Sequence, residues 1–245
     1  MKKSRIRSTV CDYIDRNSFE RATLRATLDQ IASTIPETVI FGGMLRDFAY
    51  GSARSFSSDI DLVSNSSKRD IFKAVASFNP IQNRFGGYRF ISGRRSFDIW
   101  ALEDTWALRE GLVKFDGFDS LLSTTFFGAD AAIFYLNNRD YQCNQHHLKA
   151  VSERVLDLNL QENPNPHGMV LRAIRLALKH DLAISTKLAR YMVRHWSTEA
   201  SEWVGNSFAR ELEMHICKGE EIGFRFWRQG TVAHAGGINH HENSF

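Results

Sequence analysis

The chain has 245 residues, of which 43% are hydrophobic and 24% charged, and its net charge is +3. This length allows one sizeable core with a smaller appended part, and the composition is that of an ordinary globular protein. No apolar run approaches the roughly 18–20 residues of a membrane-spanning helix, and the basic N-terminus lacks the apolar stretch of a secretory signal. We therefore expect a cytoplasmic protein with no membrane partner. The mild basic excess permits a polyanionic partner without demanding one.

The cysteines and the C-terminal histidines of the sequence do not form a recognisable metal-binding motif. Cys11, Cys143 and Cys217 are far apart and form no Cys-x-x-Cys pair, so neither a disulfide framework nor a zinc knuckle is indicated. A group of C-terminal histidines is a weak metal candidate because it falls in a stretch typical of a loose tail. These residues are His234, His240 and His241.

The first part of the chain alternates between helix and strand signals. Leu24, Leu28 and Ile31 have helical spacing within a predicted helix over 18–35. The β-branched, apolar run over 38–41 predicts a buried strand that leads directly into Gly42-Gly43 and a short helix up to Tyr50. The order is therefore strand, glycine turn, helix.

Further strands follow. Residues 60–63 form a second strand, and Ser67 is a suitable N-cap for a helix that continues to Phe78. Residues 88–91 and 96–100 predict two more strands joined by a turn around Gly93. The fold class is α/β (α+β), with a small mixed sheet.

Beyond Leu102 the pattern is mostly helical, although periodicity does not decide between strand and helix for 126–136. A turn-rich break at Asn163–Pro166 precedes a helix that continues to Leu182. We expect a head domain with an N-terminal helix over 1–140 and a helical neck and C-terminal domain over 141–245.

Asp59 and Asp61 are two apart in a predicted strand, so their carboxylates project to the same side. Buried together they repel, and a divalent cation such as Mg²⁺ removes this repulsion because it prefers carboxylate oxygens. Asp98 on a neighbouring strand would complete a metal site. The plain alternative is that Asp-x-Asp marks a strand end. Gly42-Gly43 upstream favours the functional interpretation, since glycines let phosphates approach the backbone closely.

The segments FGGMLRDFAYG and SSDIDLV together resemble the head domain of the poly(A) polymerase and CCA-adding branch of the DNA polymerase β-like nucleotidyltransferases. The resemblance implies that the glycines hold the triphosphate and that the strand aspartates bind two catalytic Mg²⁺ ions. It also implies that the arginine and aspartate of the turn fix the loop and contact the nucleotide. The matching positions are Gly42, Gly43, Arg46, Asp47, Asp59 and Asp61.

A second resemblance lies in MVLRAIRLALKHDLAIS, which is similar to the neck helix of bacterial enzymes of this branch. It implies that Arg172 and Arg175 contact the incoming nucleotide; the alternative is an amphipathic helix with a solvated basic side. Asn165–Met169 lacks the Glu-Asp-x-x-Arg element that selects C or A, and the usual Arg-Arg-Asp element is also missing. Programmed C-C-A synthesis is therefore not expected.

These features predict an enzyme that transfers NMP from an NTP, with ATP or CTP favoured, to the 3′ end of an RNA, and tRNA is one possible acceptor. Asp59, Asp61 and Asp98 are its expected catalytic and metal-binding residues. Two alternatives stay open. One is nucleotidylylation of a protein partner. Enzymes of that kind usually carry a Gly-Ser turn, whereas this chain has GGMLRD, which favours an RNA acceptor. The other is a catalytically silent RNA-binding module.

Overall fold

The computed structural model describes residues 3–16, 18–83, 86–205 and 207–218, and it divides into two compact units. The first comprises residues 1–153 and 157–162, and the second comprises residues 154–156 and 163–245. This division falls after residue 153, and the expected domain boundary at residue 140 stays a prediction. The candidate histidines of the tail, His234, His240 and His241, lie outside the described residues.

Within the described residues, the first unit is built on a seven-stranded sheet in the order β3-β4-β5-β2-β1-β6-β7. Paired strands run antiparallel except β2 and β5, which run parallel. The strands are β1 (Thr38–Phe41), β2 (Ile60–Ser64), β3 (Ile81–Gln82), β4 (Tyr88–Ser92), β5 (Arg95–Ala101), β6 (Ala132–Tyr135) and β7 (Tyr141–Cys143). The mixed α/β class is thereby confirmed. Strand β6 lies in the segment 126–136 that periodicity left undecided, and β7 lies in a region that we expected to be helical.

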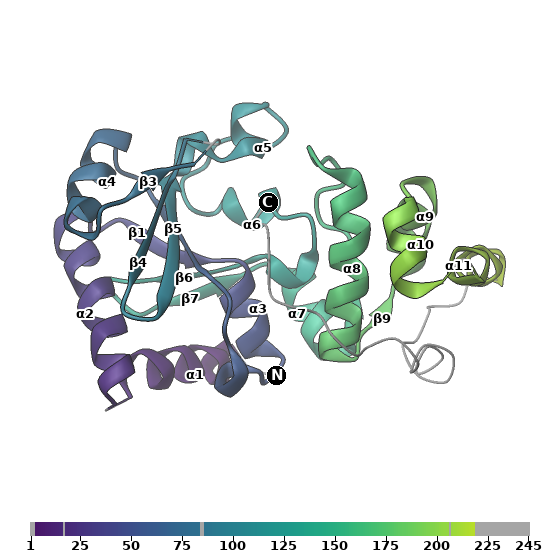
Figure 1. The fold of residues 1–245 in the computed structure, drawn as a ribbon, viewed down its shortest axis with the longest axis horizontal. Helices are drawn as coiled ribbons and strands as arrows, with labels where there is room; N and C mark the ends of the chain where they lie inside the picture. Colours follow the sequence, from purple (N-terminus) through teal and green to yellow (C-terminus); the bar gives the residue numbers. More distant parts are fainter. Residues whose placement is uncertain (1–2, 17, 84–85, 206, 219–245) are drawn as a thin grey trace. The chain divides into compact units, whose positions relative to one another are not determined.

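Helices α1 to α4 pack with the sheet around the larger of its two apolar clusters, as Figure 1 shows for the N-terminal part of the chain. The strands contribute alternate residues to this cluster, among them Ile40, Leu62, Phe97 and Phe134. The opposite face carries a smaller cluster around Val39, Val63 and Ile133. The helices of this unit are α1 (Lys3–Asp15), α2 (Phe19–Thr34), α3 (Gly43–Ala49), α4 (Lys68–Val75), α5 (Trp106–Arg109), α6 (Leu121–Thr124) and α7 (Gln145–Glu153).

Two helix starts follow directly from serine N-caps. The Ser18 side chain accepts a hydrogen bond from Arg21 N, and the Ser67 side chain accepts one from Asp70 N at 3.2 Å. These bonds satisfy amide groups that a helix start leaves without an intrahelical partner. Both helices therefore begin where the sequence predicts, and the second ends in a 3₁₀ turn over Ala76–Phe78.

Helix α1 was not predicted, because the basic residues at the N-terminus obscured its apolar face. Ile6, Val10 and Ile14 are fully buried in the larger cluster. Lys3 Nζ donates to Cys143 O at 3.4 Å and Arg7 Nε donates to Arg139 O at 2.6 Å. The helix thus covers β7 with apolar side chains while its basic side chains bond to backbone carbonyls of the first unit.

The second unit is mostly helical in its described part, as expected. It contains α8 (Pro166–His180), α9 (Thr186–Arg194), α10 (Thr198–Val204), α11 (Ser207–Lys218) and the parallel pair β8 (Val155–Leu156) and β9 (Ala183–Ile184). Helix α8 is capped by Asn165, whose side chain accepts a hydrogen bond from Gly168 N at 3.0 Å. Its buried stripe includes Val170, Ile174 and Ala177. No helix among the described residues is long and apolar enough to cross a membrane.

Candidate active site

The glycine turn lies directly beside one of the predicted carboxylates. Strand β1 ends at Phe41, whose register partner on β2 is Asp61. The next residue, Gly42, has φ +71° and ψ −123°, a conformation that side chains other than hydrogen disfavour. A Cβ atom at Gly42 would lie 3.9 Å from Asp61 Oδ2. The backbone therefore turns next to this carboxylate because a glycine stands there.

The aspartates predicted from the sequence are gathered on one face of the sheet. Asp61 and Asp98 are register partners in the parallel pair β2–β5. Because Leu62 and Phe97 point into the larger core, alternation places Asp61 and Asp98 on the opposite face. Asp59 precedes β2 by one residue, two positions before Asp61. The expectation that Asp98 lies on the strand next to Asp61 is confirmed, while its chemical role stays a prediction.

Arg89 is the residue here that sequence reasoning did not connect with the aspartates. It is the register partner of Asp98 across β4 and β5. Arg89 Nε donates to both Asp98 oxygens at 3.1 and 3.2 Å, and Nη2 donates to Asp98 Oδ2 at 2.6 Å. The same Nη2 lies 3.5 Å from Asp59 Oδ2. The hydrogen bond with Asp98 raises the pKa of Arg89, and the neighbouring charge of Asp59 adds to this effect.

The chemistry of these donors fits a divalent cation, because carboxylate oxygens are what Mg²⁺ prefers. In this structure, Asp59 and Asp98 instead form ion pairs with the guanidinium of Arg89. Among the described residues, no group of three or more His, Cys, Asp or Glu side chains converges as a metal site. Asp59, Asp61 and Asp98 therefore remain predicted metal ligands, and the cation in contact with Asp59 and Asp98 in this structure is Arg89.

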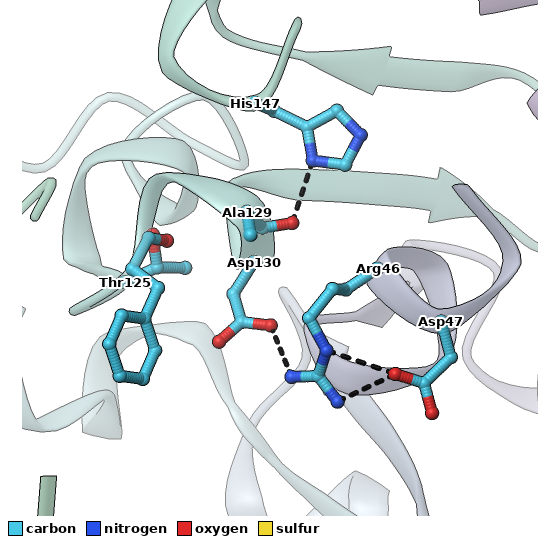
Figure 2. Close-up of polar contacts among 7 residues, drawn as sticks. Arg46, Asp47, Thr125, Ala129, Asp130 and His147 are labelled. Atoms are coloured by element: carbon cyan, nitrogen blue, oxygen red, sulfur yellow. Dashed lines mark hydrogen bonds and ion pairs between the residues drawn. The ribbon is translucent and has the colours of Figure 1, made fainter. Parts of the chain in front are cut away.

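A second charged group, the buried triad, consists of Arg46, Asp47 and Asp130 (Figure 2). Arg46 Nε donates to Asp47 Oδ1 at 3.0 Å, and Nη1 donates to Asp130 Oδ1 at 2.6 Å. All three residues are buried. Burial lowers the pKa of Arg46, but the charges of Asp130 and Asp47 outweigh it and raise this pKa overall. Because a Cβ atom at Gly43 would lie 3.4 Å from Arg46 Nη2, the triad supports the glycine turn.

Asp130 was missed because its partner is far away in the sequence. The segment 126–136 resolves into a 3₁₀ turn over Gly128–Asp130 followed by β6, which settles the strand-or-helix ambiguity. The sequence offered one signal for Asp130: it is a single carboxylate inside an apolar run. A buried charge requires a partner of opposite charge, so such a residue indicates an ion pair. That partner is Arg46.

The fully buried His147 contacts Ala129, the residue before Asp130, as Figure 2 shows. His147 Nδ1 is 2.8 Å from Ala129 O, which can only accept, so Nδ1 carries the proton. Nε2 then accepts from the Tyr141 hydroxyl at 2.7 Å. Burial lowers the pKa of His147 from 6.5 to about 4, and the imidazole is therefore neutral. These bonds hold the residue immediately before Asp130.

The remaining residues predicted to contact the nucleotide belong to the second unit. Arg172 and Arg175 are both on α8 in the second unit, and the guanidinium of Arg175 lies 5.4 Å from the centre of the Trp203 ring. Their contact with a nucleotide stays a prediction. Phe97, the residue before Asp98, is fully buried, and its ring stacks on that of Phe90 with the centroids 5.0 Å apart, so it packs in the core.

No protein-family model matches the sequence, and no curated protein matches it. Solved structures do match. A CCA-adding enzyme with CTP aligns with TM-score 0.60 and 17% identity over 88% of this chain and 51% of its own. The Thermotoga maritima CCA-adding enzyme complexed with tRNA aligns with TM-score 0.58 and 16% identity over 86% and 50%. This chain has the fold of CCA-adding enzymes.

The resemblance inferred from the glycine turn and the aspartates is thus confirmed at the level of fold. A tRNA nucleotidyltransferase complexed with a primer tRNA and an incoming ATP analogue also aligns, with TM-score 0.51 and 17% identity over 82% of this chain and 60% of its own. The chain spans about half the length of the CCA-adding enzymes it matches.

Proposed function

We propose that this chain is a nucleotidyltransferase that transfers a nucleoside monophosphate from an NTP to the 3′ hydroxyl of an RNA. The observation that carries the proposal is the placement of Asp61 beside both Asp98 and the Gly42 turn on one face of the sheet. The fold adds support, because structures of proteins with this fold are described with CTP, ATP, an ATP analogue or tRNA.

The reaction needs the 3′ oxygen to bond to the α-phosphorus while the bond to the bridging oxygen breaks and pyrophosphate leaves. Asp59, Asp61 and Asp98 would hold Mg²⁺, which when bound activates the hydroxyl and stabilises the leaving oxygen. The residues of the turn, Gly42 and Gly43, would let the triphosphate approach the backbone closely. Arg172 and Arg175 would contact the nucleotide from the neck helix.

The acceptor proposed is RNA, with tRNA as one candidate, and the nucleotide is ATP or CTP. We do not propose programmed C-C-A addition. In the stretch that replaces the base selector, Asn165 caps α8 and His167 Nδ1 lies 2.9 Å from His195 O. These residues provide no carboxylate that could form hydrogen bonds with a base. Such hydrogen bonds are what lets an enzyme select one base strongly over another.

The test incubates the full chain with each labelled NTP, Mg²⁺ and a mixture of total cellular RNA and protein. Label in small RNA is the expected result. Label in the protein fraction instead would move the proposal to a protein acceptor, and no label with RNA still bound would favour a silent binding module. Asp61→Asn should abolish transfer while circular dichroism shows an intact fold, and full activity in that variant would overturn the mechanism. Lys73→Gln, at an exposed ion pair with Asp70, is the control.

A further inference from the structure

Arg89 occupies the carboxylates that the proposed reaction needs for its metal. Its guanidinium contacts both oxygens of Asp98 and reaches Asp59 Oδ2 with the same Nη2. The Asp98 side chain is only 9% exposed, so its charge cannot rely on water alone. The contact is therefore a specific ion pair of a nearly buried carboxylate.

The position of Arg89 is fixed by the sheet. Arg89 and Asp98 are cross-strand partners in the β4–β5 register, so their side chains project side by side on the same face. The planar guanidinium matches the two carboxylate oxygens in a fork that lysine cannot reproduce. The pairing of β4 with β5 therefore places the guanidinium of Arg89 next to the carboxylate of Asp98.

A divalent cation at Asp98 would need the oxygens that Arg89 already holds. Asp98 Oδ2 accepts the shortest of these hydrogen bonds, at 2.6 Å, and Asp59 Oδ2 faces the same nitrogen. Two cations at one carboxylate repel each other, and each lowers the affinity of the other. Binding of the metal and binding of the guanidinium at Asp98 therefore oppose each other.

We propose that Arg89 is a positioning residue that acts as a resident counter-ion of the catalytic aspartates, and that a divalent cation binds there by displacing its guanidinium from Asp98. Without metal, Arg89 keeps Asp98 and Asp59 together on one face of the sheet. With metal, the guanidinium is released toward solvent. This inference rests on the proposed function, because it presumes that the aspartates bind a divalent cation.

The test measures Mn²⁺ binding to the full chain by electron paramagnetic resonance of free Mn²⁺, without nucleotide. Arg89→Gln should bind Mn²⁺ about tenfold more tightly than the unmodified protein, because the competing charge-assisted hydrogen bonds are gone. Arg89→Lys, which keeps the charge and loses the fork, should fall between the two. Lys73→Gln removes a charge of the same sign from an exposed pair and should change nothing. Equal or weaker binding by both Arg89 variants overturns the inference.

Two further measurements keep the outcomes separable. If Asp61→Asn binds Mn²⁺ as well as the unmodified protein, the proposed metal site itself is wrong, whatever Arg89 does. If the Arg89 variants do not fold, the Nε–H resonance of Arg89 can be followed by NMR in the unmodified protein during a Mg²⁺ titration. Loss of its hydrogen bond on saturation supports displacement, and an unchanged resonance contradicts it.

Discussion

Within the buried triad, we predict that Arg46 contributes more to the stability of the protein than Asp130 does. Arg46 is the positive charge between Asp47, which is completely buried, and Asp130, which is 7% exposed. Arg46→Met leaves two buried carboxylates without this counter-ion. Asp130→Asn leaves Arg46 balanced by Asp47 and keeps an oxygen that can accept from Nη1. We therefore expect the arginine substitution to be clearly more destabilising.

The expected sizes follow from general values for buried charges. Removing one partner of a buried ion pair costs about 3–5 kcal/mol, and Arg46→Met should lie in this range. Asp130→Asn weakens one charge-assisted hydrogen bond and should cost about 1–2 kcal/mol. A gap of about 2 kcal/mol corresponds to roughly 4–8 °C in the melting temperature for a chain of this size.

The assay is thermal and urea unfolding followed by circular dichroism, at pH 7.5 and at pH 5. In Arg46→Met, loss of the Arg46 charge beside the buried carboxylates favours their protonated form, so the stability deficit relative to the unmodified protein should shrink as the pH falls. Asp130→Asn should show no such relief. The reasoning is refuted if the asparagine variant is as unstable as the methionine variant, or if the deficit of the methionine variant is the same at both pH values.

Three further predictions concern the surroundings of the site. Because the pKa of His147 is lowered from 6.5 to about 4, the unfolded chain binds more protons than the native protein in this window, so stability is lost as the pH falls through it. Urea unfolding should therefore show the unmodified protein losing about 2–3 kcal/mol more than His147→Gln between pH 7.5 and pH 4.5; equal losses contradict the buried neutral state. Gly42→Ala meets no clash but forces a side chain into a positive φ, which should cost about 1–3 kcal/mol in unfolding experiments and slow transfer; unchanged stability and rate would contradict the strained turn. Arg172→Ala and Arg175→Ala should each raise KM for the NTP about tenfold while Lys187→Ala does not, as steady-state kinetics can establish; an unaltered KM in both would remove the neck arginines from the site.

The parts of the site that sequence predicted are those encoded locally. A strand that leads into Gly42-Gly43, and an Asp-x-Asp pattern at Asp59 and Asp61, can be recognised within a few residues. Arg89 and Asp130 could not be assigned their partners, because those contacts depend on strand pairing and on a turn far away in the chain. Placement of Asp98 beside Asp61 was predicted because both stand in apolar strands that had to share a sheet.

The same reasoning explains why helix α1 and strand β7 were missed, and why β6 could not be distinguished from a helix. In the first turns of α1, Ile6 stands between Arg5 and Arg7, so the segment resembles a charged, exposed stretch. Its apolar side becomes buried only when it packs against elements such as β7. Strands β6 and β7 are short, and their hydrogen bonds depend on joining the edge at β1. Tertiary pairing, rather than local propensity, determines their state.

The parallel pairing of β2 with β5 has a consequence for how such sites vary between proteins. The separation of Asp61 and Asp98 is set by the spacing of adjacent strands, about 4.8 Å, and not by the number of residues between them. The intervening segment, with α4 and the β3–β4 hairpin, can lengthen or shorten without moving the two carboxylates apart. A single-residue slip in either strand, by contrast, would turn one aspartate toward the helices. Searches for related proteins should therefore hold the strand register fixed and leave the intervening length free.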